Sequence, residues 1–183
     1  MRVIAGTLKG RRLESPAWDG LRPTSDRLRE TLFNILAPRV AGARVLDAFA
    51  GTGALGIEAL SRGAAHVTFI ESDPRGQALI ADNLAHCRIE TGYTVLRVPV
   101  VRGLEHLRTD PTFAPFDIML FDPPYDLDAE AVLAGTDAVL APGGLLVFEH
   151  ARRRVVPASS GRLVRVRQVR SGDSMLTMYE LGS

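Results

Sequence analysis

Residues 44–56 read RVLDAFAGTGALG, and this stretch decides the fold. Its first six residues have the apolar composition of a buried strand. The glycines that follow have the spacing Gly-x-Gly-x-x-Gly, and residues 57–62 then predict a helix that ends at Gly63. Glycines between a strand and a helix permit a tight turn and close approach of a ligand to the backbone. The stretch therefore predicts a strand–turn–helix unit of an α/β fold, with a ligand at the turn.

Strands and helices alternate along the rest of the chain. Asp73 and Pro74 predict the start of a helix that runs to Asn83, a second helix is expected over residues 128–140, and residues 103–107 form at most a short one. This alternation is typical of a doubly wound, mostly parallel α/β sheet, which binds ligands at the carboxyl ends of its strands. A C-terminal antiparallel hairpin completes a seven-stranded sheet. The predicted strands lie at residues 44–49, 66–70, 93–98, 116–121, 145–148, 162–169 and 175–181.

Residues 1–40 predict an extension of this domain. Two short strands, at residues 3–4 and 10–13, are joined by a turn and form a small hairpin. Apolar residues at positions 28, 32, 35 and 36 mark one face of a helix, with Thr24 as its N-cap and Pro38 as its end. A two-stranded hairpin is marginal alone, so we expect it to pack on residues 41–183 within one globular unit.

Length and composition fit a single globular domain. The chain has 183 residues, of which 46% are hydrophobic and 23% charged. It contains no apolar run of about 18 residues, and its N-terminus lacks the hydrophobic block of a signal peptide. Cys87 is the single cysteine, which excludes an internal disulfide, and the four histidines lack metal-ligand spacing. We therefore expect a cytoplasmic monomer that binds neither a membrane nor a metal.

A net charge of +1 conceals a marked asymmetry. Residues 1–44 hold nine Lys and Arg against four Asp and Glu, residues 45–150 hold six against fifteen, and residues 151–183 hold seven against two. The two ends are therefore +5 each and the middle is −9. Basic ends suit a polyanion, and an acidic middle suits a cationic cofactor. The alternative is that arginine is merely the usual basic residue here, since it accounts for 21 of the 22.

A second motif, Asp122-Pro123-Pro124-Tyr125, follows the strand predicted at residues 116–121. Two prolines restrict the backbone and remove two N–H donors, so the Pro123 carbonyl is held in place. Asp122 and this carbonyl can both accept hydrogen bonds from one amino group, and Tyr125 offers a ring for stacking. The motif suits the exocyclic amine of a nucleobase, and these four residues are the predicted catalytic set. The alternative is a proline-rich turn with a solvated acid.

An exocyclic amine is a poor nucleophile, because its lone pair is delocalised into the ring. Two acceptors that hold its protons favour the tetrahedral nitrogen, so no strong base is required beforehand. A proton can leave afterwards to Asp122 or to water.

The ligand at the glycine turn is expected to be S-adenosylmethionine rather than a nicotinamide dinucleotide. Asp47, four residues before Gly51, would repel a pyrophosphate but suits the ammonium group of a methionine moiety. Glu71 follows Gly51 by 20 residues, a spacing at which an acid can bind ribose hydroxyls. An N-cap role for Asp47 is the alternative. The predicted cofactor-binding residues are Asp47, Ala50, Gly51, Thr52, Gly53 and Glu71.

These motifs resemble those of a known class of enzymes. Residues 47–56 resemble motif I of class I methyltransferases, and Glu71 resembles their ribose-binding acid. The motif at Asp122 resembles the D/N-P-P-Y/F/W signature of enzymes that methylate amino groups of nucleic acids. One departure is that residues 99–103 offer no Asp or Asn for the cofactor's adenine amine, so contacts to this ring are expected to be apolar or from the backbone.

With residues 2–6, 10–13 and 21–34 included, nearly the whole chain resembles the bacterial family that methylates a guanine N2 amine in 16S ribosomal RNA. The resemblance implies the same reaction here, on a small-subunit assembly particle. Three alternatives remain: an adenine-N6 methyltransferase of DNA or RNA, a non-catalytic RNA-binding assembly factor of the same fold, and a nicotinamide oxidoreductase. Residues 152–154 are further candidates for phosphate contacts. The predicted RNA-binding residues are Arg2, Lys9, Arg11, Arg12, Arg22, Arg27 and Arg29.

Overall fold

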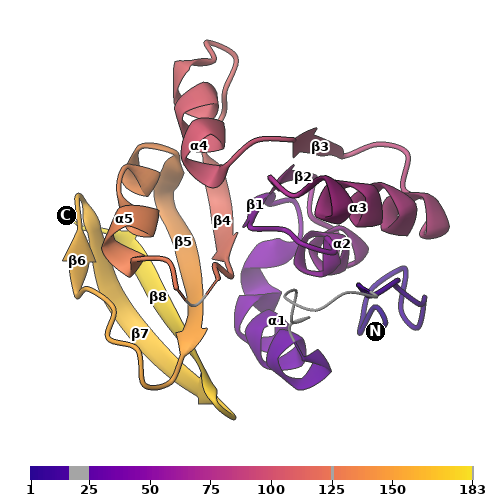
Figure 1. The fold of residues 1–183 in the computed structure, drawn as a ribbon, viewed down its shortest axis with the longest axis horizontal. Coiled ribbons are helices and arrows are strands. Elements are labelled where there is room, and N and C mark those ends of the chain that lie inside the picture. Colours follow the sequence, from indigo (N-terminus) through magenta and orange to yellow (C-terminus); the bar gives the residue numbers. More distant parts are fainter. Residues whose placement is uncertain (17–24, 125, 183) are drawn as a thin grey trace.

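The computed structural model describes residues 1–16, 25–124 and 126–182. Within these residues, eight strands form one sheet with the order β3-β2-β1-β4-β5-β8-β7-β6 (Figure 1). Strands β1 to β5 run parallel, and β8, β7 and β6 continue the sheet in antiparallel pairs. The predicted doubly wound sheet is confirmed, with one short edge strand added. The strands are β1 (Arg44–Ala48), β2 (His66–Ile70), β3 (Tyr93–Leu96), β4 (Phe116–Phe121), β5 (Leu140–Ala151), β6 (Ser159–Ser160), β7 (Leu163–Ser171) and β8 (Ser174–Leu181).

Helices cover both faces of this sheet. α1, α2 and α3 contribute to one buried apolar cluster, and α4 and α5 contribute to a second cluster on the opposite face (Figure 1). Strands buried on both faces are nearly continuous hydrophobic runs, as β1, β2 and β4 are. No helix in the described part of the chain is long and apolar enough to cross a membrane. The helices are α1 (Asp26–Val40), α2 (Ala54–Ser61), α3 (Pro74–His86), α4 (Val100–Thr109), α5 (Ala129–Leu133) and the 3₁₀ helix η1 (Thr136–Ala138).

Close packing of α2 on β2 depends on Gly56, the third glycine of the turn. A Cβ atom at this position would lie 2.2 Å from Cε1 of Phe69 and 2.8 Å from Cγ1 of Val67. Any larger residue would push the helix away from the strand. The third glycine therefore sets the distance between helix and sheet.

The N-terminal extension packs on α2. Arg2 and Arg12 form one antiparallel bridge, so the predicted hairpin is present with a single bridge in place of two strands. Glu58 of α2 is fully buried and accepts hydrogen bonds from the backbone N–H groups of Ile4 (2.7 Å) and Ala5 (3.0 Å). Apolar residues of the extension join the cluster formed by α1 and α2. The extension and the sheet therefore share one core.

The structure corrects both predicted ends of α1. Its N-cap is Ser25, whose Oγ accepts a hydrogen bond from the Leu28 N–H (3.2 Å); the predicted cap, Thr24, lies outside the described residues. The helix continues through Pro38 to Val40, which is buried against the core. Proline is tolerated there because it removes one hydrogen bond in an exposed last turn, where water can replace the lost donor.

Two other helix predictions were wrong. The short helix expected at residues 103–107 is the ten-residue α4, which buries apolar residues at 100, 104 and 107. The helix expected over residues 128–140 stops at Leu133, because Gly135 adopts a left-handed conformation (φ 74°). Strand β5 consequently starts at Leu140 instead of residue 145.

Candidate active site

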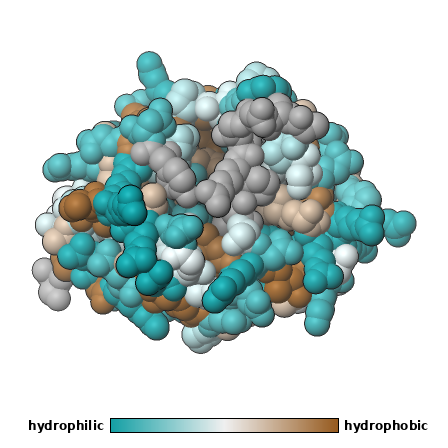
Figure 2. Space-filling model, turned by 60° about the horizontal axis from the view of Figure 1, so that its bottom comes forward, coloured by the Kyte–Doolittle hydropathy of each residue, from teal (hydrophilic) through white to brown (hydrophobic). Residues whose placement is uncertain are grey.

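A cavity of about 960 Å³ opens at the carboxyl ends of β1, β2, β4 and β5. The turns after these strands line it, together with the first turn of α1 and the start of β8. This volume is at the upper end of the range for small-molecule sites, so it can hold a cofactor and part of a second molecule. Figure 2 shows the lower side of the molecule as drawn in Figure 1, the side toward which β4 and β5 run. Most of the surface visible there is hydrophilic, with smaller apolar patches.

Asp47, near the end of β1, is 1% exposed and lines the cavity. The backbone N–H of Gly56 donates a hydrogen bond to its Oδ2 atom (2.8 Å). Burial raises the pKa of the Asp47 carboxyl well above its usual value; the Gly56 hydrogen bond opposes this, and the negative charges of Asp122 and Glu71 add to it. A buried acid among other acids attracts a cationic ligand and repels a phosphate.

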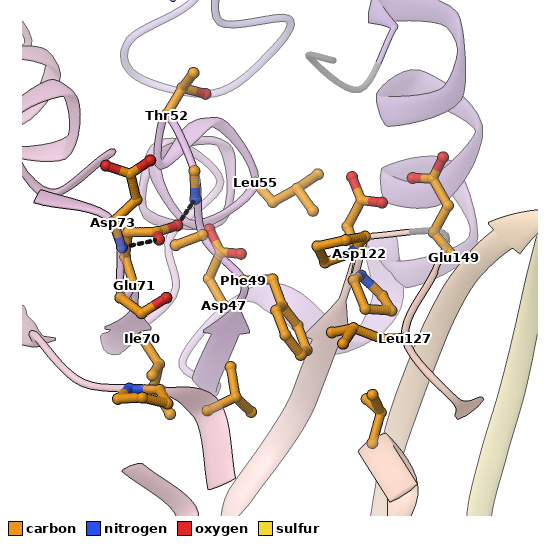
Figure 3. A pocket seen from close by; sticks show the side chains of 18 of the residues that line it. Asp47, Phe49, Thr52, Leu55, Ile70, Glu71, Asp73, Asp122, Leu127 and Glu149 are labelled. Carbon is orange, nitrogen blue, oxygen red and sulfur yellow. Dashed lines mark hydrogen bonds between the residues drawn. The ribbon is translucent and has the colours of Figure 1, made fainter. Parts of the chain in front are cut away.

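Glu71 follows β2 and supports the glycine turn. The Gly51 N–H donates to its Oε2 atom and the Asp73 N–H donates to its Oε1 atom, both at 2.7 Å (Figure 3). Gly76 leaves room for this arrangement, because a Cβ there would lie 2.9 Å from Cγ of Glu71 and 3.2 Å from the Gly51 carbonyl oxygen. A carboxylate oxygen that accepts one backbone hydrogen bond has a second lone pair for a ligand hydroxyl.

The residues of the predicted cofactor site come together in the structure. All of them except Gly53 line the cavity. Gly53 instead has φ 75° and its Cβ position faces Ile80 of α3, so it shapes the turn. Asp73 lines the cavity and also caps α3, as predicted, because its carboxylate accepts the Arg75 N–H (2.8 Å).

Asp122, Pro123 and Pro124 line the same cavity at the end of β4. Asp122 is half-buried and Pro123 is buried. In Figure 3 the Asp122 carboxylate lies beside that of Glu149, and the Phe49 ring lies between Asp47 and Asp122. Tyr125 lies outside the described residues, so its role in stacking stays a prediction. The structure therefore joins the two predicted motifs in one site.

Several lining residues were missed by the sequence analysis. Phe49 has φ 61°, an unusual conformation for an aromatic residue, and its ring contacts Phe121 edge-on with centroids 6.1 Å apart. Glu149 of β5 is 8% exposed and accepts a hydrogen bond from Ser174 Oγ of β8 (3.0 Å). An acid that directly follows the predicted apolar strand at residues 145–148 was the available signal for Glu149.

The prediction that Arg29 contacts RNA was wrong. This side chain is 0% exposed, and its Nη2 atom donates to the Arg2 carbonyl oxygen and to Asp26 Oδ1, both at 2.7 Å. Its Nη1 atom lies 3.8 Å from Glu58 Oε2, so two buried charges face each other under the extension. Arg29 therefore holds the extension on the core. Its spacing from Phe33 and from other buried α1 residues was the signal that could have shown this.

The other predicted RNA-binding cations lie in different parts of the structure. Arg11 donates from Nη1 to the Cys87 carbonyl oxygen (2.9 Å) and thereby caps the end of α3. Lys9 is exposed in the turn that is anchored on Ser61, at the end of α2 away from the cavity. Arg22 lies outside the described residues. The other exposed cations of the predicted set are Arg2, Arg12 and Arg27.

A sheet of this order, with an acidic turn after its first strand and an Asp-Pro-Pro corner after its fourth, defines a class I methyltransferase. Enzymes of this class use S-adenosylmethionine as the methyl donor.

Comparison with known proteins gives the family. The family model described as conserved hypothetical protein 95 matches residues 1–180. Ribosomal RNA small subunit methyltransferase D of Escherichia coli (strain K12) is 45% identical over 149 residues, which cover 81% of this chain and 71% of that protein. The protein of the same name from Haemophilus influenzae is 40% identical over 154 residues, covering 81% and 78%. The chain belongs to this family of bacterial ribosomal RNA methyltransferases.

A solved structure shares the whole fold. A hypothetical protein of Thermus thermophilus superimposes with a TM-score of 0.83 at 30% sequence identity, and the match covers 99% of each chain.

Proposed function

We propose that this protein methylates the N2 amine of a guanine in 16S ribosomal RNA, on a small-subunit assembly particle. The observation that carries the proposal is that the acidic glycine turn with Asp47 and the Asp-Pro-Pro corner line one cavity. The family assignment supports ribosomal RNA as the substrate.

The residues of the cofactor half fit S-adenosylmethionine. Asp47 faces the cavity as a buried acid that suits an ammonium group, and Glu71 can accept a ribose hydroxyl. Ile70, Pro99 and Val100 provide an apolar wall for an adenine ring, in place of the acid or amide that the sequence lacks there. A dinucleotide would bring a pyrophosphate to this acidic turn, which disfavours a nicotinamide cofactor. The bound cofactor supplies an electrophilic methyl group.

In the other half, Asp122 and the Pro123 carbonyl oxygen hold the two protons of the guanine amine. This fixes the nitrogen lone pair toward the methyl group, and Asp122 or water takes a proton after transfer. The target base has to leave its stack to reach the cavity, at a cost of a few kcal/mol. Stacking on Tyr125 is expected to recover part of this energy.

Nucleoside analysis tests the proposed function. The purified protein would be incubated with methyl-labelled S-adenosylmethionine and either free 16S ribosomal RNA or small-subunit particles from cells that lack the gene. We expect N2-methylguanosine as the labelled product, and mapping it identifies the nucleotide. N6-methyladenosine would contradict the guanine assignment. Absence of transfer to both substrates, with the cofactor bound, would favour a non-catalytic assembly factor.

We further propose that Arg2, Arg12 and Arg27 form the RNA-binding face of residues 1–40. All three side chains are exposed. Arg27 lies in the first turn of α1, two positions after Ser25, which lines the cavity. The main chain after Arg12 leads toward the glycine turn, because Asn83 bonds both Glu14 and the Thr52 carbonyl oxygen.

Replacing Arg12 and Arg27 together by alanine should lower the slope of log affinity for RNA against log salt by about 1.5, since each phosphate contact contributes about 0.7–0.9. Filter binding at several salt concentrations measures the slope. Lys9→Ala is the matched control, because this cation lies at the far end of α2, and it should leave the slope unchanged. An equal effect of Lys9→Ala would contradict the placement of the RNA.

A further inference from the structure

Glu149 lies next to the amine-holding corner. Phe121 of β4 pairs in register with Phe148 of β5, so the residues that follow them, Asp122 and Glu149, are neighbours across two parallel strands. Adjacent strands lie about 4.8 Å apart. Both carboxylates line the cavity, and in Figure 3 they lie side by side and point the same way. A base whose amine is held by Asp122 therefore presents its neighbouring ring atoms to Glu149.

Burial and a hydrogen bond hold the Glu149 side chain in its position. The residue is 8% exposed, and Ser174 Oγ donates a hydrogen bond to its Oε1 atom (3.0 Å). A buried carboxylate destabilises a protein unless hydrogen-bond donors surround it. A base with a suitably placed N–H group would provide a further donor.

Among the amino-bearing bases, only guanine has such a group. The carbon that carries its N2 amine is bonded to N1, which bears a proton. In adenine and in cytosine, the ring nitrogen beside the amine-bearing carbon is an acceptor without a proton. An ionised carboxylate accepts hydrogen bonds and donates none. It therefore attracts the N1–H group of guanine and repels the acceptor nitrogen of adenine or cytosine.

We propose that Glu149 determines the specificity for guanine by accepting a hydrogen bond from its N1–H. Asp122 and Pro123 hold the amine of any amino base, whereas Glu149 rejects adenine. The inference rests on the proposed function and assigns one further contact within its site. Discrimination based on a buried hydrogen-bonding group is strong, because the wrong base places its own acceptor against that group in place of a donor.

The test compares two RNAs that differ at the target position, which the nucleoside analysis above maps. One RNA carries guanine at this position and the other carries 2-aminopurine. 2-Aminopurine keeps the C2 amine, but its N1 is an acceptor. The wild-type enzyme should methylate guanine with a kcat/KM about 100-fold above that for 2-aminopurine. Glu149→Gln, which can donate to N1, should reduce this ratio about 100-fold or invert it, with the affinity for S-adenosylhomocysteine unchanged.

The controls separate the possible outcomes. Glu180 is a half-buried acid of β8, the strand that pairs with β5, and it forms an ion pair with Arg39; its replacement, Glu180→Gln, should leave the ratio unchanged. A Glu149→Gln variant that loses activity equally on both bases would show a structural role and overturn the inference. Equal methylation of the two bases by the wild-type enzyme would overturn it without any variant. Failure of the wild-type enzyme to methylate guanine would instead overturn the proposed function itself.

Discussion

An Asp122→Ala variant should transfer methyl groups about 10²–10³-fold more slowly than the wild type. This is the usual effect of removing one preorganised hydrogen-bonding group from a transition state. Asp122 follows β4 at the edge of the cavity, beside the Pro123 carbonyl. Without it the amine keeps one acceptor, and its lone pair stays delocalised into the ring. Single-turnover kinetics with labelled cofactor measure the loss directly.

Cofactor affinity should be retained or improved in the same variant. The negative charge of Asp122 raises the pKa of Asp47, so its removal favours the ionised form that binds an ammonium group. Asp122→Asn is the matched control: its side-chain oxygen still accepts one hydrogen bond, and we expect its turnover to lie between the other two. An Asp122→Ala variant with wild-type turnover would exclude this residue from the mechanism.

Replacing Asp47 by asparagine should weaken S-adenosylmethionine binding by about 10–100-fold, as expected for the loss of a charge-assisted hydrogen bond. The same change should stabilise the ligand-free protein at neutral pH, with a rise in Tm of roughly 2–4 °C for each kcal/mol recovered. Asparagine can still accept the Gly56 N–H, but it carries no charge to bury. Calorimetry with the cofactor and thermal unfolding without it measure the two effects.

The sign of the stability change follows from the raised pKa of Asp47. Because the folded protein binds this proton more tightly than the unfolded chain does, the free energy of unfolding falls as the pH rises from about 3.8 through the raised pKa. The ligand-free protein is therefore less stable at neutral pH than it would be with an acid of ordinary pKa at this position. Asparagine should remove that pH-dependent component.

Cofactor binding should respond to pH in the opposite direction. Acidification protonates Asp47 and weakens the attraction for an ammonium group, and it does so at a higher pH than an ordinary aspartate would require. The Asp47→Asn variant should lack this dependence. Asp82→Asn, an exposed acid on α3, is the control and should behave as the wild type does. Wild-type cofactor affinity in the Asp47→Asn variant would contradict its placement at the methionine end.

The buried acids of this site, Asp47 and Glu149, are expected to lower the free energy of unfolding and to serve ligand binding. Asp47 and Glu149 are almost fully buried at the cavity, and each accepts a hydrogen bond from the protein. Neither is explained by the packing of the core, because apolar residues would fill these positions at lower energy. Acids at such positions are better explained by the ligands proposed for them above.

Local patterns predicted most of the fold and the two motifs that line the cavity. The turn at residues 44–56 and the corner at Asp122 are encoded by neighbouring residues, because glycine and proline act on their own backbone. The alternation of strands and helices then placed both motifs at one edge of the sheet. Element ends were less accurate. Helix α1 continues through Pro38 because Val40 packs on the core, and α5 ends early because Gly135 adopts a left-handed conformation.

By itself the sequence determined the class of fold, the acidic turn and the rigid corner, since each depends on residues a few positions apart. Only the tertiary structure decided that Arg29 is buried against Glu58 and that Glu149 stands beside Asp122. These pairs are 29 and 27 residues apart in the sequence. Their contacts arise from helix packing and from strand register, which are set by the whole core; a short stretch of residues can indicate that a side chain is buried but not which distant residue it meets.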